Sequence, residues 1–243
     1  MKIIPMLNFT ALFGMLSTRE IKMTTFSCQE SNQSPSWSTF DIFLWKVIPS
    51  RFGGGIGYIQ RFKDAWVQHN KMLIKSSAKK YGFPPELLAG ICWVEVGGDP
   101  EFIDRIAFEV RAFFWSSSDW VNRNITITHP PERTSFGAVS MQLRTAANTL
   151  GIQADQLSID ELSQLASCPQ QDVFNIDLAA RHVRQIIDHD KLQKDQPELA
   201  MEHVRIVGAR YNRGLGLSLE AIRKNTSYGD FIVKRWAYFA GLL

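Results

Sequence analysis

One short helix constrains the fold more than any other feature, because residues 81–100 mark both of its ends. The Pro-Pro pair at 84–85 supplies the fixed φ that a first helical turn tolerates, and Glu86 complements the positive start of a helix. The Gly-Gly-Asp-Pro run at 97–100 is a stop signal. We therefore predict a short helix whose last residues include a carboxylate, Glu95.

The position of Glu95 is unusual for a charged side chain. Leu88, Ile91, Cys92 and Glu95 follow the spacing of one helical face, so the carboxylate projects on the same side as apolar residues. Burial and the negative end of the helix dipole both disfavour the ionised form and raise its pKa. A carboxyl that keeps its proton can act as a general acid. A structural glutamate that caps the helix or pairs with an arginine fits the spacing equally well.

Four segments, in order along the chain, resemble lytic transglycosylases of the soluble type and goose-type lysozymes. The run YGFPPELLAGICWVEVGG at 81–98 resembles the family's YG-(I/V)-PPELL-x-AI-x-x-ES-G, in which the Glu is catalytic. The other three are SFGAVSMQLRTAANTLG at 135–151, FNIDLAARHVRQII at 174–187 and VGARYNRGLG at 207–216. Four such matches over about half of the chain are hard to obtain by chance.

The resemblance implies a mainly α, lysozyme-like α+β domain with a small β or loop lobe, and no metal or organic cofactor. It places the catalytic acid at Glu95. Three positions depart from the family pattern, namely Val96, Ser140 and Thr145, where Ser, Gly and Pro are usual. The substrate-binding residues that the resemblance implies are Ser135, Gly137, Met141, Gln142, Tyr211 and Asn212.

The family cleaves the β-1,4 bond between N-acetylmuramic acid and N-acetylglucosamine in peptidoglycan. Ordinary hydrolysis needs a second carboxylate, and the nearest in sequence, which match no motif, are Asp99, Asp104, Glu109 and Asp119. The lytic route, in which the muramic 6-hydroxyl attacks in place of water, is therefore favoured over a hydrolytic muramidase. A catalytically silent glycan-binding module is the alternative from a different class.

Composition suits one globular domain, which we place at residues 56–243 behind a partly flexible N-terminal arm at 1–55. The chain has 243 residues, 45% hydrophobic content and a net charge of +3. No basic block with interleaved aromatics indicates nucleic acid. Cys28, Cys92 and Cys168 show no metal-ligand spacing, and an odd count argues against a disulfide framework.

The N-terminus carries no clear export signal, since the apolar stretch at 1–16 is patchy and no small-residue cleavage site follows it. Met23 is an equally plausible start. No run of about 18 apolar residues predicts a transmembrane helix. These features and a wall-cleaving domain fit an antibacterial toxin that a machine such as type VI secretion delivers to a rival's periplasm, with an immunity protein as partner. A housekeeping or phage-tail wall enzyme is the competing interpretation.

Hydrophobic periodicity predicts the remaining elements. We expect single helices over 58–80 and 228–243, with the latter serving to stabilise the core, and a hairpin over 116–133, where Trp120 and the preceding Trp115 are candidates to stack on sugars. A helix over 139–150 would carry Met141 and Gln142 at its start. His182, His189 and His203 are interpreted as surface or structural residues. Further helices are expected over 102–114, 155–166, 173–190 and 199–212.

Overall fold

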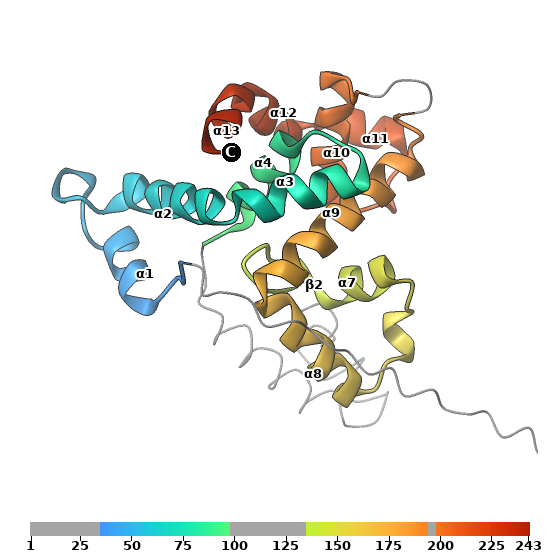
Figure 1. Ribbon diagram of the computed structural model, residues 1–243, viewed down its shortest axis with the longest axis horizontal. Helices are drawn as coiled ribbons and strands as arrows, with labels where there is room; N and C mark the ends of the chain where they lie inside the picture. The colour runs from blue at the N-terminus through green and yellow to red at the C-terminus, as the bar shows by residue number, and fades with distance from the viewer. Residues whose placement is uncertain (1–34, 98–134, 194–197) are drawn as a thin grey trace, which may run out of the picture.

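The computed structural model describes residues 35–97, 135–193 and 198–243, and these are mainly helical (Figure 1). The N-terminal elements are α1 (Thr39–Lys46), the 3-10 turn η1 (Ser50–Phe52), α2 (Gly55–His69), α3 (Lys71–Tyr81) and α4 (Pro85–Glu95). A short hairpin, β1 (Ser135–Phe136) and β2 (Met141–Gln142), leads into α7 (Leu143–Leu150), η3 (Ala154–Gln156), α8 (Ile159–Ser167) and η4 (Cys168–Gln170). The last elements are α9 (Asp172–His189), α10 (Met201–Arg213), α11 (Leu219–Arg223), α12 (Ser227–Lys234) and α13 (Trp236–Leu242).

Helix α4 lies at the centre of the upper part of the molecule, in contact with α2, α3, α9, α10, α12 and α13. Its residues from Leu87 to Trp93 are all buried, because the helix is apolar on every side. A Cβ at Gly90 would lie 2.8 Å from Ile232 of α12, so the glycine lets the two helices approach closely. The predicted helix ending at Glu95 is confirmed.

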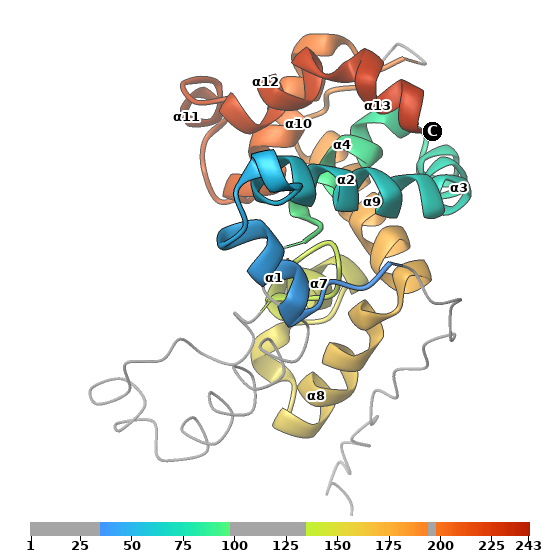
Figure 2. The ribbon, with the colours of Figure 1, turned by 90° about the vertical axis from the view of Figure 1, so that its left-hand side faces the viewer.

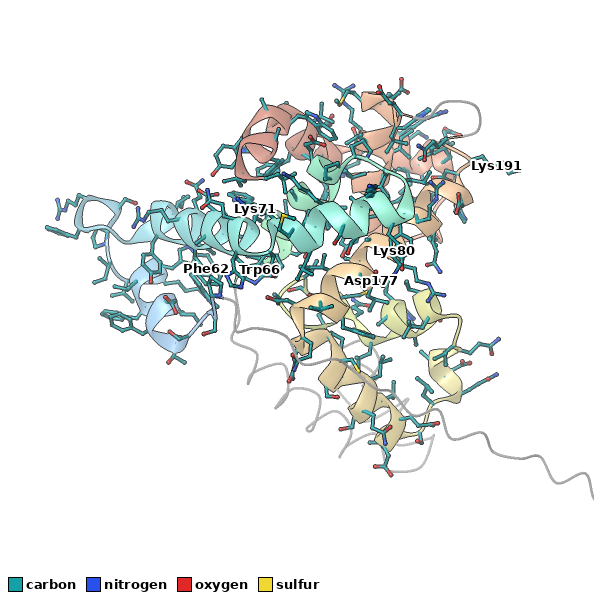
Figure 3. All side chains as sticks on the ribbon, viewed as in Figure 1. Phe62, Trp66, Lys71, Lys80, Asp177 and Lys191 are labelled. Carbon is teal, nitrogen blue, oxygen red and sulfur yellow. The ribbon has the colours of Figure 1, made fainter. Side chains whose placement is uncertain are left out.

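Helix α9 connects the lower part of Figure 1, which contains α7 and α8, with the upper part, where it packs against α3, α4 and α10. Its stripe of Ile176, Ala180 and Val183 is fully buried, as the sequence pattern predicted. On its exposed side an ion pair of 2.7 Å joins Asp177 to Lys80 of α3, and Figure 3 shows the two side chains close together. The long helix over 173–190 is therefore confirmed, within one residue at each end.

The hairpin is a minimal antiparallel pair, with Ser135 opposite Gln142 and Phe136 opposite Met141. The Val139 amide donates to Asn175 Oδ1 of α9 at 2.7 Å, which ties the turn to the long helix. The expectation that Met141 and Gln142 begin a helix is wrong, since both belong to β2 and α7 begins at Leu143.

Two expected single helices are each divided in the structure. The helix over 58–80 breaks at Asn70, whose buried amide donates to Asp172 Oδ2 at 3.1 Å. The helix over 228–243 breaks at Arg235, where φ and ψ are −109° and 17°. Both breaks depend on distant contacts or on backbone geometry that hydrophobic periodicity does not report. The helix over 102–114 and the hairpin over 116–133, with Trp115 and Trp120, lie outside the described residues.

Two further findings concern membrane-spanning helices and the state of the cysteines. No helix within the described ranges combines the length and hydrophobicity needed to cross a bilayer. Cys92 is free and buried in the core, whereas Cys168 is disulfide-bonded, which the odd cysteine count did not lead us to expect.

Candidate active site

A cleft of about 710 Å³ opens where the end of α4 meets the hairpin, α7, α9 and the end of α10. It contains five of the six substrate-binding positions implied by the resemblance, together with Glu95. The residues that line it are Glu95, Ser135, Ser140, Met141, Gln142, Arg144, Thr145, Asn148, Thr149, His182, Gln185, Tyr211, Asn212, Arg213, Gly214, Leu215 and Gly216.

Glu95 is the last residue of α4 and is largely buried at the wall of this cleft. Tyr228 of α12 donates its hydroxyl hydrogen to Glu95 Oε1 at 2.7 Å. Burial raises the pKa of Glu95, and the Tyr228 hydrogen bond and attraction to Lys63 oppose the shift without cancelling it. No salt bridge joins Glu95 to another described residue. The pKa direction expected from the sequence is confirmed, with burial as its main cause.

The end of α4 is held by a buried lysine from α2. Lys63 Nζ donates to the carbonyl oxygens of Trp93 at 2.9 Å and Val94 at 2.8 Å, and also to that of Val96. These carbonyls have no partner inside the helix, and a cation is favourable at this end of the dipole. Burial lowers the pKa of Lys63 to about 8, although its attraction to Glu95 works the other way. Lys63 thus fixes the backbone on both sides of Glu95.

Tyr211 and Asn212, at the end of α10, line the cleft as predicted. The Tyr211 hydroxyl is buried and finds no hydrogen-bond partner in the part of the chain that the structure describes. Its ring lies edge-on to His182, with centroids 5.6 Å apart. Burial and the nearby charge of Glu95 raise the pKa of Tyr211 well above its usual value, so the hydroxyl keeps its proton. Tyr211 therefore lines the cleft with its ring, while its hydroxyl is covered.

The hairpin contributes Ser135, Met141 and Gln142 to the cleft, with Met141 buried and Gln142 exposed. Gly137, predicted as a substrate-binding residue, does not line it. Its φ is +79°, and a Cβ there would lie 2.1 Å from the carbonyl oxygen of Pro169. The glycine is required by close contact with η4 and by its backbone conformation, so its role is to shape the loop.

Several lining residues escaped the sequence analysis. His182, for which a surface or structural role was expected, agrees with the structural role, since it is buried with Nδ1 3.2 Å from the Thr149 hydroxyl, but its place in the cleft was not predicted. Burial lowers its pKa, so the ring is neutral near pH 7. Arg144 and Asn148, which lie one turn apart on α7, also line the cleft and were not predicted.

No local signal pointed to Tyr228 or Lys63. Tyr228 is separated from Glu95 by 133 positions, so only the tertiary structure brings them together. The candidate bases Asp99, Asp104, Glu109 and Asp119 lie outside the described residues. Among the described residues that line the cleft, Glu95 is the sole carboxyl group.

Comparison of the chain with family models, with characterised proteins and with solved structures finds no match. The fold and the site define the class on their own: a mainly α protein with a largely buried carboxyl group at the wall of a polar cleft.

Proposed function

We propose that this protein is a lysozyme-like enzyme that cleaves the β-1,4 bond between N-acetylmuramic acid and N-acetylglucosamine in peptidoglycan. The observation that carries the proposal is the environment of Glu95, a largely buried carboxyl with a raised pKa in a cleft that also contains Tyr211, Asn212, Met141 and Gln142. These residues come from three of the four segments that resemble the family.

Glu95 acts first as the general acid. A carboxyl that is protonated near neutral pH can donate to the glycosidic oxygen as the bond to the anomeric carbon breaks. The proton leaves with the N-acetylglucosamine hydroxyl, and positive charge develops on the muramic ring. The Tyr228 hydrogen bond and the Lys63 charge then stabilise the carboxylate that remains.

The second step favours a lytic product. Glu95, now a base, takes the proton of the muramic 6-hydroxyl as its oxygen attacks the anomeric carbon, which closes a 1,6-anhydro ring and restores the acid. A hydrolytic route places a second carboxylate across the bond to activate water. The four candidates for that carboxylate, Asp99, Asp104, Glu109 and Asp119, match no motif of the family, and this favours the lytic route over a hydrolytic muramidase.

Two other features agree with a wall substrate. Arg144 and Arg213 bring positive charge to the cleft, which suits a polymer that carries carboxylates. The disulfide at Cys168 fits an oxidising compartment such as the periplasm. Delivery to that compartment as an antibacterial toxin with an immunity partner is part of the same proposal.

The test is to incubate purified protein with peptidoglycan sacculi and to identify the soluble muropeptides by mass spectrometry. The variant is Glu95→Gln, which keeps the size and hydrogen-bonding ability of the side chain. The matched control is Glu86→Gln, the same change in the first turn of the same helix and outside the cleft. We expect anhydro-muropeptides from the wild type and the control, and a loss of about 10³-fold or more with Glu95→Gln.

Each other result points to a different function. Products heavier by one water mean a hydrolytic muramidase and direct attention to Asp99, Asp104, Glu109 and Asp119. If the wild type gives no product but binds glycan in a pull-down, the protein is a catalytically silent glycan-binding module. Equal activity of the wild type and Glu95→Gln rules out Glu95 as the acid.

A further inference from the structure

An apolar surface remains exposed at the N-terminal end of the described chain. Of the nine large hydrophobic side chains described as exposed, five fall within residues 40–56. We call these five the α1–η1 surface. They are Phe40, Phe43, Val47, Phe52 and Ile56, with exposed fractions of 64%, 46%, 60%, 70% and 68%.

The surface belongs to an ordered element. Helix α1 has the sequence TFDIFLWK, yet none of its residues is buried. Phe40, Phe43 and Val47 recur at helical spacing and so share one face, and the two phenyl rings stack with centroids 6.4 Å apart. Burying apolar area is the main force that stabilises a fold, so an apolar helix face that no described residue covers calls for an explanation outside the core.

Polar contacts and ring packing hold α1 in place. Ser38 and Asp41 form a capping box at its start, and the Tyr58 hydroxyl of α2 donates to Asp41 Oδ1 at 2.5 Å. The ring of Trp37 lies against those of Trp45, Tyr58 and Phe62. The exposed phenyl groups are therefore presented on a preformed support and do not need to fold on binding.

Positive side chains surround the α1–η1 surface. Lys46, Arg51 and Arg61 are all exposed, and the Arg51 guanidinium lies 4.9 Å from the Phe52 ring centroid. Asp41 is the one acidic residue between positions 38 and 61, and its carboxylate accepts from Ser38 and Tyr58. The surface thus combines aromatic rings with three cations that form no salt bridge to a described residue.

We propose that the α1–η1 surface docks this protein on an anionic lipid bilayer. Phenyl and aliphatic side chains enter the boundary between headgroups and acyl chains, while lysine and arginine remain at the phosphates. Each cation near an anionic surface adds to the attraction. Exposed phenyl rings bordered by lysine and arginine are the composition of segments that lie at an anionic membrane interface. Helix α1 stands on the left of Figure 1 and faces the viewer in Figure 2, so it lies at the periphery of the described chain.

The test is cosedimentation of the full chain with vesicles of phosphatidylethanolamine and phosphatidylglycerol, and with vesicles of phosphatidylcholine alone. The variant combines Phe40→Ser, Phe43→Ser and Phe52→Ser. The control is Met72→Ser, because Met72 of α3 is 69% exposed but distant in sequence from the surface. All four side chains are exposed, so the folded state tolerates their replacement, and circular dichroism checks this directly.

We expect the wild type and Met72→Ser to bind the anionic vesicles, more weakly in high salt and on phosphatidylcholine. The triple variant should bind at least about tenfold more weakly. Binding that the triple variant retains in full would overturn the proposal by moving the contact elsewhere in the chain. So would no binding by the wild type. Concentration-dependent dimers in sedimentation velocity, lost in the triple variant and unaffected by lipid, would also overturn it and make a second copy the occupant. These results do not depend on whether the protein cleaves peptidoglycan, so the two proposals are tested separately.

Discussion

Two largely buried carboxylates, Glu95 and Asp190, sit at helix ends in very different surroundings. Asp190 follows α9 and accepts two hydrogen bonds from Arg210, at 2.7 and 2.8 Å, within a pair whose side chains are 5% and 1% exposed. Glu95 ends α4 and accepts one hydrogen bond from a neutral tyrosine. Both lie near the end of a helix, so their helical positions do not distinguish them.

The difference shows in the direction of each pKa. Burial would raise the pKa of Asp190, but the hydrogen bonds from Arg210 and His189 and the charge of Arg210 outweigh it and hold the pKa below its usual range. At Glu95 burial prevails and the pKa rises. Asp190 is thus the arginine-paired structural carboxylate that the sequence left open for Glu95. A charged arginine that donates two hydrogen bonds keeps a carboxylate ionised and structural. A single hydrogen bond from a neutral tyrosine leaves the carboxyl group able to exchange a proton.

The largest expected effect lies in the Asp190 region. Arg210→Met leaves the buried Asp190 carboxylate with only His189 beside it and removes donors to the carbonyls of Leu215 and Leu217, so we expect a loss of about 3 kcal/mol in the free energy of unfolding. Urea denaturation measures it. Because the pKa of Asp190 is depressed in the folded state, its stabilisation is present at neutral pH and is lost as pH falls below about 4.

The control for this prediction is Lys80→Met, which breaks the exposed pair with Asp177 and should cost about 1 kcal/mol or less. Equal effects of the two substitutions would contradict the distinction between a buried structural pair and an ordinary surface pair.

An intermediate effect is expected from Tyr228→Phe. It removes the hydroxyl that donates to Glu95 and stabilises its ionised form, so the pKa of Glu95 rises further. Activity on sacculi should fall about tenfold. The pH at which activity declines on the basic side should rise, because Glu95 stays protonated up to a higher pH. The measurement is a pH profile of muropeptide release. Tyr238→Phe, which removes an exposed hydroxyl bonded to Asp64, should leave the profile in place.

The smallest effect is a gain in stability from Glu95→Gln. A carboxyl with a raised folded pKa stabilises fully below its unfolded pKa of about 4.3, and this contribution is lost as pH rises through the folded pKa. At pH 7 the variant should therefore unfold at higher urea, with a gain in the range of single stabilising substitutions, about 0.5–2 kcal/mol. The gain should disappear near pH 4. A variant less stable than wild type at pH 7 would mean that Glu95 is structural, like Asp190.

Much of the helical framework could be predicted because its signals are local. Pro85 and the glycines after Glu95 mark the ends of α4, and the stripe through Ile176 and Val183 marks α9. The helix breaks at Asn70 and Arg235 could not be predicted, since the helical spacing of apolar residues continues across both positions. Met141 and Gln142 were placed correctly in the cleft but in the wrong element, because two residues of strand are too short to show alternation.

The amino-acid sequence by itself determined that a helix ends at Glu95 and that this carboxyl lies on a face shared with apolar residues. Caps, stops and periodicity act over a few residues, so they can be recognised in the sequence. Only the tertiary structure decided that Tyr228 and Lys63 meet at Glu95 while Arg210 pairs with Asp190. Burial and charge act through space, and the groups responsible come from helices far apart in the chain.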